Sequence, residues 1–221
     1  MVEPATTGAP TSLWRVGRAS SPVHFSAIDP VDAAVATAGN RFDVPGGEVL
    51  YAASKPSGAF AETIARMRPT ARMQALPMDG DSGYMTVGSV PAEWRMQRRL
   101  VEVHLDEPAP FLDVDAAATH TFLTEKMAPV LAAMGIDNLD VSHVRGSNRL
   151  LTRAIAQYAY VQQDSEGRLA FSGIRYESKV GTHECWAVFG GTEFSEGRKI
   201  SIEKADPDLT RVAKDFGLTI H

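Results

Sequence analysis

Three neighbouring residues, His183, Glu184 and Cys185, form the tightest group of potential metal ligands in the sequence. In an extended strand His183 and Cys185 would point to the same face. A structural zinc site takes four ligands, so this pair is two short and we expect no metal here. Cys185 also begins the apolar run Cys-Trp-Ala-Val-Phe, where a cysteine usually behaves as a small buried hydrophobe with a raised thiol pKa. We therefore expect Cys185 in the core.

The common fingerprints of phosphate binding and hydrolysis are missing from the sequence. It contains no GxGxxG, no GxxxxGK followed by Ser or Thr, no HExxH and no GxSxG. The Rossmann and P-loop ways of binding phosphate groups are therefore unsupported. Any chemistry must come from single polar residues placed within otherwise regular segments.

Five such residues also have ordinary structural interpretations. Arg15, inside an apolar run, could cover the core with its stem, and Tyr51 could be a core tyrosine with its hydroxyl bonded. Arg41 could bond the terminal carbonyls of a preceding helix. Glu62 and the arginine four residues later form a common helix pair, and Ser178 could serve the turn that follows it. Taken one at a time, none of the five requires a function.

Taken in order, however, the segments that carry these residues resemble the RES domain, which is named for an arginine, a glutamate and a serine. The matching segments are residues 13–16 (Leu-Trp-Arg-Val), 39–42 (Gly-Asn-Arg-Phe), 49–53 (Val-Leu-Tyr-Ala-Ala) with 59–63 (Ala-Phe-Ala-Glu-Thr), and 173–178 (Gly-Ile-Arg-Tyr-Glu-Ser). Their order and spacing follow the family pattern over most of residues 13–190. Residues 78–99 and the tail after Gly191 contain no segment that we can match.

The resemblance implies a fold similar to the ADP-ribosyltransferase toxins and a cleft that binds NAD as its substrate. It assigns Arg41, Glu62 and Ser178 as the named arginine, glutamate and serine, and it places Arg15 and Tyr51 in the same cleft. It further implies breakdown of NAD by hydrolysis or phosphorolysis, or transfer of ADP-ribose to a protein. Many members of the family are toxins that a helix-turn-helix antitoxin holds inactive, so such a partner is expected.

The chemistry of the assigned residues agrees with this implication. Guanidinium groups such as those of Arg15 and Arg41 bind phosphate oxygens through paired, charge-assisted hydrogen bonds. Loss of neutral nicotinamide leaves positive charge on the ribose, and a carboxylate such as Glu62 can stabilise that charge. Tyr51 could stack on nicotinamide, and Ser178 could hold its amide or a ribose hydroxyl. One acid and no metal suffice for this reaction.

Three alternatives stay open at this stage. The acceptor of the ADP-ribosyl group can be water, phosphate or a protein, and Glu177 could supply the second acid of a protein-modifying transferase. The chain could instead be an inactive module that binds NAD. Arg175 and Ser178 are an odd number of residues apart, so a regular strand would point only one of them into the cleft, and we choose Ser178.

Helices and strands are predicted from hydrophobic periodicity and from capping residues. Helices are expected from Asp29 towards Gly39, over 58–67 with Ser57 as the cap, over 121–134 and over 148–160. Strands are expected at 48–53, 100–104, 169–172, 174–178 and 184–189. The elements do not alternate strictly, which favours an α+β class. We predict a single domain over 13–221, with an ADP-ribosyltransferase-like split β-sheet core and flanking helices, preceded by a disordered tail over 1–12.

Bulk composition excludes several classes of protein. The formal net charge of −5 over 221 residues argues against direct nucleic-acid binding, which usually needs a basic surplus. The basic group at Arg95, Arg98 and Arg99 is too short to change this, and we interpret it as a solvated face. A single cysteine suits a reducing compartment, and neither a bilayer-spanning segment nor a signal peptide is recognisable. We expect a cytoplasmic protein, and the oligomeric state stays open.

Overall fold

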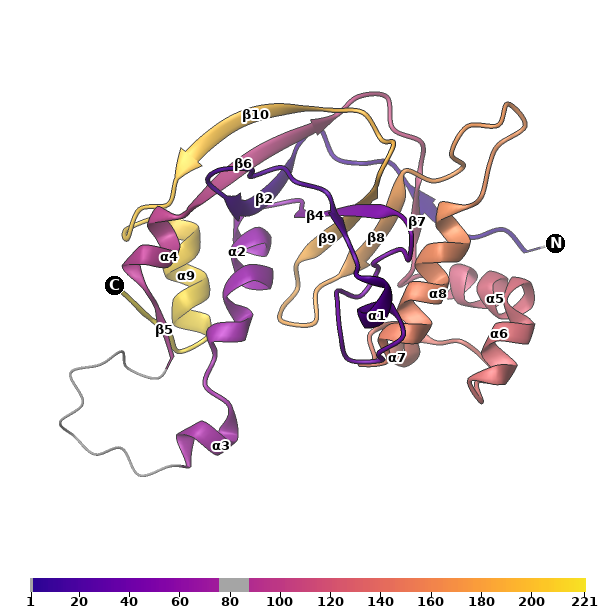
Figure 1. The fold of residues 1–221 in the computed structure, drawn as a ribbon, viewed down its shortest axis with the longest axis horizontal. Coiled ribbons are helices and arrows are strands. Elements are labelled where there is room, and N and C mark those ends of the chain that lie inside the picture. Colours follow the sequence, from indigo (N-terminus) through magenta and orange to yellow (C-terminus); the bar gives the residue numbers. More distant parts are fainter. Residues whose placement is uncertain (1, 76–87) are drawn as a thin grey trace.

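The computed structural model describes residues 2–75 and 88–221. Within these residues nine strands form one curled sheet in the order β1-β7-β8-β9-β4-β2-β6-β10, with β3 paired to β4 (Figure 1). The strands are β1 (Thr6–Thr7), β2 (Leu13–Arg18), β3 (Ser26–Ala27), β4 (Glu48–Ala53), β6 (Arg98–Leu105), β7 (Phe111–Asp113), β8 (Gly173–Glu177), β9 (Glu184–Phe189) and β10 (Phe194–Ser201). Two short parallel strands, β5 (Ser89–Val90) and β11 (Thr219–Ile220), pair separately.

The sheet is split between β2 and β4. These two neighbours share one register pair, Trp14 with Ala53, whereas β4 pairs with β9 along 49–53 and β2 pairs with β6 along its whole length. The two halves of the sheet therefore diverge beyond this pair. Together with the flanking helices, this confirms the predicted α+β domain with a split sheet.

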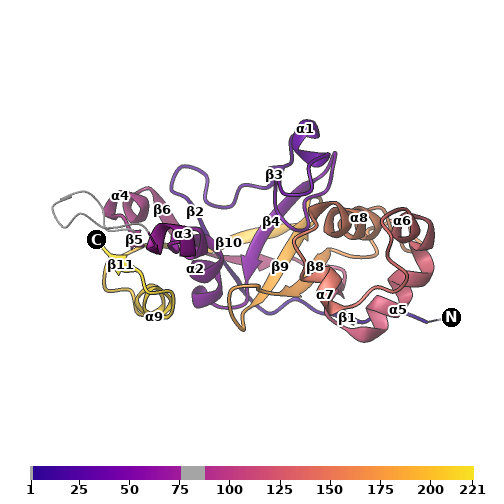
Figure 2. The same ribbon diagram turned by 90° about the horizontal axis from the view of Figure 1, so that it is seen from below.

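Helices lie in two groups, one beside each half of the sheet (Figures 1 and 2). The first group contains α2 (Pro56–Ile64), α4 (Ala92–Met96) and α9 (Pro207–Asp215). The second contains α5 (Ala117–Lys126), α6 (Ala128–Ala133), α7 (Val141–Val144) and α8 (Arg149–Tyr160). The short helices α1 (Pro30–Ala33) and α3 (Ala71–Gln74) lie in connections, and a 3₁₀ turn, η1 (Ala65–Met67), extends α2. In the described part of the chain, every helix is too short or too polar to cross a lipid bilayer.

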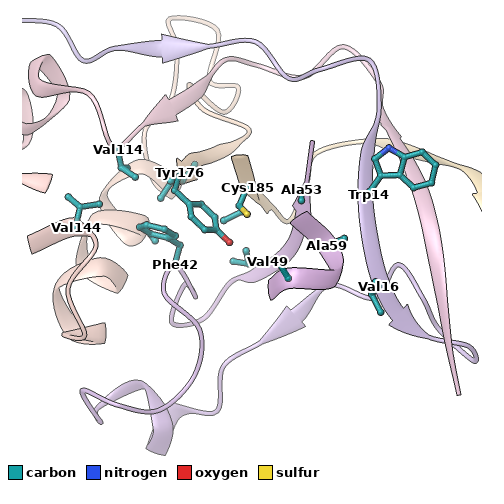
Figure 3. Close-up of a cluster of buried hydrophobic side chains, with 14 of the residues drawn as sticks. Trp14, Val16, Phe42, Val49, Ala53, Ala59, Val114, Val144, Tyr176 and Cys185 are labelled. Carbon is teal, nitrogen blue, oxygen red and sulfur yellow. The ribbon is translucent and has the colours of Figure 1, made fainter. Parts of the chain in front are cut away.

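Apolar residues form one cluster on each face of the sheet. The larger cluster joins the sheet to both helix groups and includes Trp14, Phe42 and Tyr176 (Figure 3). Phe42 packs against Tyr176 with ring centroids 5.0 Å apart. The smaller cluster includes Trp186, which meets Phe111 edge-on. Cys185 is fully buried in the larger cluster, as expected, and burial raises the pKa of its thiol.

Several predicted elements match the structure and others do not. The strands at 48–53 and 184–189 are found at the predicted residues, and the helix predicted over 148–160 is found as α8 (Arg149–Tyr160). The helix predicted over 121–134 is wrong, because the chain forms α5 and α6 there with a break at Met127. Pro129 lacks an N–H and fits the first turn of a new helix better than the interior of a long one. No strand forms at 169–172.

Two chain ends also differ from the prediction. Residues 1–12 were expected to be disordered, yet Thr6 and Thr7 pair with β7 and the Ala5 amide donates to the Thr119 hydroxyl at 3.0 Å. Backbone pairing with a sheet edge orders this short polar segment, which composition does not reveal. After Gly191 the chain adds the edge strand β10 and the helix α9, which had no predicted counterparts.

Candidate active site

A cavity of about 670 Å³ opens where the two halves of the sheet diverge. Its walls come from β2, β4 and α2, and from the segments that follow β8 and precede β4. Four of the five residues singled out in the sequence line it, namely Arg15, Arg41, Tyr51 and Glu62. The fifth, Ser178, contacts Glu62 directly. The fold thus brings all five together from positions up to 163 residues apart in the sequence.

Glu62 lies on α2 and accepts a hydrogen bond from Ser178, with 2.5 Å between the Ser178 Oγ and the Glu62 Oε1. Ser178 directly follows β8, and its Oγ also accepts from the amide of Val180 at 3.0 Å. The hydroxyl therefore serves the turn and orients the carboxylate at the same time. The Ser178 proton is thus donated to Glu62 in this structure. The predicted role of Ser178 in holding a group of the substrate stays a prediction.

Gly58 explains how α2 comes close enough for this contact. A Cβ at this position would lie 2.8 Å from the Cβ of Ala53 in β4 and 3.3 Å from the Cβ of His183. The first contact is shorter than side chains tolerate and the second is tight, so a larger residue would push α2 away from β4 and from the turn after Ser178. A small residue in the first turn of α2 therefore helps to place Glu62.

Arg41 joins three segments of the chain. It is 7% exposed, and its two terminal nitrogens donate to the carbonyls of Glu177 at 3.1 Å and Val144 at 3.0 Å. Its guanidinium also lies 5.0 Å from the ring centre of Phe42 and 4.9 Å from that of Tyr176. Burial lowers its pKa. Arg41 therefore holds the cavity wall together, and only part of its donor capacity can face a ligand.

Tyr51 holds the loop that carries Arg41. Its hydroxyl donates to the carboxylate of Asp43 at 2.9 Å and accepts from the amide of Phe42 at 3.0 Å. The same carboxylate accepts from the amide of Asn40 at 2.5 Å, which closes the loop. Burial, followed by the charge of Asp43, raises the pKa of Tyr51 well above its ordinary value. The polar end of Tyr51 is thus engaged within the protein.

Arg15 spans the split in the sheet. Its Nη1 donates to the carbonyl of Tyr51 in β4 at 2.7 Å, and its Nε donates to the carbonyl of Pro22 at 3.1 Å. The side chain thus bonds a β4 carbonyl near the point where the two strands separate. Burial lowers its pKa, because the surrounding protein replaces the water that would stabilise its charge.

Five further cationic residues line the cavity, and none of them was predicted to do so. They are Arg18, Arg66, Arg98, Arg149 and Lys179. Together with Arg15 and Arg41 they make seven, whereas Glu62 supplies the single carboxylate that lines this cavity among the described residues. A chain of net charge −5 therefore concentrates positive charge at one place. Arg98 had been interpreted as part of a solvated face and Arg66 as a helix partner of Glu62, so local spacing gave no sign of this cluster.

The sequence matches the RES domain over residues 12–210. The chain belongs to the RES domain family. Among solved structures, it is similar to a chain of the M. tuberculosis MbcT–MbcA toxin–antitoxin complex, with a TM-score of 0.51 and 11% sequence identity over 96% of this chain and 91% of that chain. At this identity the likeness concerns the fold. A search of curated proteins finds no match.

Two polar residues of the RES segment 173–178 lie outside the cavity. Arg175 binds the carboxylates of Glu184 at 3.0 Å and Asp113 at 3.4 Å, as the odd separation from Ser178 predicted. The carboxylate of Glu177 is bound by Arg145 at 2.6 Å and does not line the cavity. The geometry therefore does not favour Glu177 as a second acid.

Residues 2–75 and 88–221 contain no group of three or more histidine, cysteine, aspartate or glutamate side chains that could hold a metal ion. Around β8, the carboxylates of Asp115 and Glu177 pair with Arg145, and that of Glu184 pairs with Arg175. The cavity therefore offers one carboxylate, a hydroxyl that orients it, and a wall of cations. This set suits an anionic substrate on which positive charge develops during reaction.

Proposed function

We propose that this RES domain cleaves NAD⁺ at the bond between nicotinamide and ribose, by hydrolysis or phosphorolysis. The observation that carries the proposal is the position of Glu62, a single carboxylate that Ser178 orients within a cavity lined by seven cationic side chains. The cavity of about 670 Å³ also lies within the range of roughly 300–1,000 Å³ that is usual for small-molecule sites.

The cations suit the pyrophosphate of NAD⁺. Guanidinium groups bind phosphate oxygens in paired, charge-assisted hydrogen bonds, so they can replace a glycine-rich loop. Arg41 and Arg15 have donors committed to backbone carbonyls. Arg18, Arg66 and Arg149 line the same cavity, and their guanidinium groups make no hydrogen bond within the described chain. The substrate's phosphates therefore have further guanidinium groups available besides the two that the resemblance named.

Glu62 suits the reacting end of the substrate. When the C–N glycosidic bond breaks, its electron pair leaves with nicotinamide and the ribose gains oxocarbenium character. A carboxylate beside that ribose stabilises the charge where it develops. Ser178 binds Oε1, which leaves Oε2 to face the ribose or a ribose hydroxyl. An oxygen of water or phosphate then bonds to the sugar carbon and gives up a proton, yielding ADP-ribose or its phosphorylated form.

The proposal extends to the cellular role. The similar solved fold comes from a toxin–antitoxin complex. We therefore propose a toxin whose depletion of NAD⁺ is restrained by an antitoxin partner of the helix-turn-helix type. Co-purification of this chain with the product of a neighbouring gene, and recovery of NAD⁺ in cells that express both, would support the pairing.

Incubation of the purified protein with NAD⁺ tests the reaction. We expect free nicotinamide, together with ADP-ribose or a phosphorylated ADP-ribose identified by mass spectrometry. Glu62→Gln keeps the shape of the side chain but removes its charge, so turnover should fall about 100- to 1,000-fold. Glu125→Gln is a matched control, because Glu125 is also an exposed helical glutamate but does not line the cavity. Equal turnover by Glu62→Gln and the wild type would refute the role of Glu62, and label from NAD⁺ on a protein would identify a transferase.

A further inference from the structure

Three of the cavity's arginines gather where β2, β6 and η1 meet. Arg18 ends β2 and lies directly opposite Arg98, the first residue of β6, in the antiparallel register. Arg66 lies in η1, four residues after Glu62, which is about 6 Å along a helix axis. A second cavity, of about 410 Å³, adjoins this group and shares Arg18 and Arg98 with the first. We call Arg18, Arg66 and Arg98 the arginine triad.

The triad is electrostatically unfavourable in the protein alone. Like charges directly opposite each other on paired strands destabilise a sheet. Burial lowers the pKa of Arg98, and the neighbouring charges of Arg66 and Arg18 lower it further. Across the described residues, no carboxylate forms an ion pair with any of the three. An anion between the three would remove this repulsion.

The triad is also partly preorganised. The guanidinium of Arg98 lies over the ring of Trp94, 5.0 Å from its centre, and its Nη1 donates to the Trp94 carbonyl at 3.3 Å. Its remaining donors are therefore held in position at the cavity. The side chains of Arg18 and Arg66 are exposed and make no hydrogen bond within the described chain. Their guanidinium groups can turn towards a ligand at little cost.

We propose that the arginine triad binds a phosphate group, next to Glu62 and towards η1. Planar guanidinium groups from two neighbouring strands and from η1 can each bind phosphate oxygens in pairs, and more than one arginine favours a doubly charged group. The phosphate belongs either to the dinucleotide or to free inorganic phosphate that accepts the ADP-ribosyl group. This assignment of a ligand source rests on the proposed function, whereas anion binding by the triad does not.

Calorimetric titration with inorganic phosphate and, separately, with ADP-ribose tests the triad without requiring turnover. The variants are Arg18→Gln and Arg66→Gln, with Arg168→Gln as control, because Arg168 is an exposed arginine outside both cavities. Removing one guanidinium group that makes charge-assisted hydrogen bonds should raise the Kd about tenfold to a hundredfold. Since Arg18→Gln removes a repulsion, the ligand-free variant should melt no lower than the wild type.

Each outcome has a defined meaning. If only inorganic phosphate binds more weakly to the two variants, the triad takes the free acceptor. If ADP-ribose binds more weakly, the triad holds a phosphate of the dinucleotide. Wild-type affinity of both variants for both probes, or no binding of either probe to the wild type, overturns the proposal. A protein that binds ADP-ribose through the triad but releases no nicotinamide would refute the proposed function and leave the phosphate subsite standing.

Discussion

Replacing Ser178 by alanine removes one hydroxyl with two structural tasks. The hydroxyl donates to the Glu62 Oε1 at 2.5 Å and accepts from the Val180 amide at 3.0 Å. Without it the Glu62 side chain gains rotamer freedom, and its carboxylate no longer has a fixed orientation towards the cavity. We expect the Ser178→Ala protein to fold and to bind NAD⁺, but to react more slowly.

The size of the effect follows from the type of bond. A hydrogen bond to a charged group contributes about 1.5–3 kcal/mol net. Glu62 is solvent-exposed, so water can replace part of this bond, and the lower figure of about 1.5 kcal/mol applies, which corresponds to roughly a tenfold rate loss. The loss should appear in kcat rather than in KM, because the carboxylate acts on charge that develops only in the transition state. Loss of the Val180 contact should cost about 1 kcal/mol of folding stability.

Steady-state nicotinamide release from Ser178→Ala and Ser178→Thr measures this effect. The threonine variant keeps a hydroxyl and should recover most of the lost kcat, which a purely structural role of the turn would not require. Thermal melts of both variants separate a loss of folded protein from a loss of rate. Wild-type kcat in well-folded Ser178→Ala would refute the idea that this hydroxyl positions Glu62.

Two further predictions concern the cavity wall. Arg41→Ala should lower the free energy of unfolding by about 2–4 kcal/mol, because two backbone carbonyls lose their donors. In calorimetry its Tm should fall by roughly 5–15 °C. Arg41→Lys should recover less than half of the lost stability. A melt of Arg41→Ala at the wild-type temperature would contradict this bridging role. Burial raises the pKa of Tyr51 and of Tyr176 well above the ordinary value of 10.0, so folding stability should be full below about pH 10 and decline as the pH rises further. Urea unfolding between about pH 8 and 11 should show this decline. Tyr51→Phe should be less stable at neutral pH, but its stability should decline less steeply with pH. An unchanged slope of stability against pH in this variant would contradict the contribution of Tyr51.

The sequence alone determined much of the framework. The apolar runs at 48–53 and 184–189 appear as strands because their residues favour a buried, pleated surface, and Asn148 caps α8 through its own side chain. The order of the RES segments predicted the family and four of the residues that line the cavity. The strands, the cap and each single RES segment depend on residues that are close in sequence, and the segments follow one another in a fixed order, so a pattern along the chain is enough to recognise them.

Tertiary structure decided what the polar side chains do. Ser178 bonds Glu62, from which it is separated by 116 positions in the sequence, and Arg41 donates to carbonyls of two distant segments. The register of β2 with β6 places Arg18 against Arg98, which sequence spacing alone had assigned to a solvated face. Strand register and the split between the two halves of the sheet arise from pairing between remote segments. Local periodicity carries no information on that pairing, and for this reason the charge of the cavity emerged only from the fold.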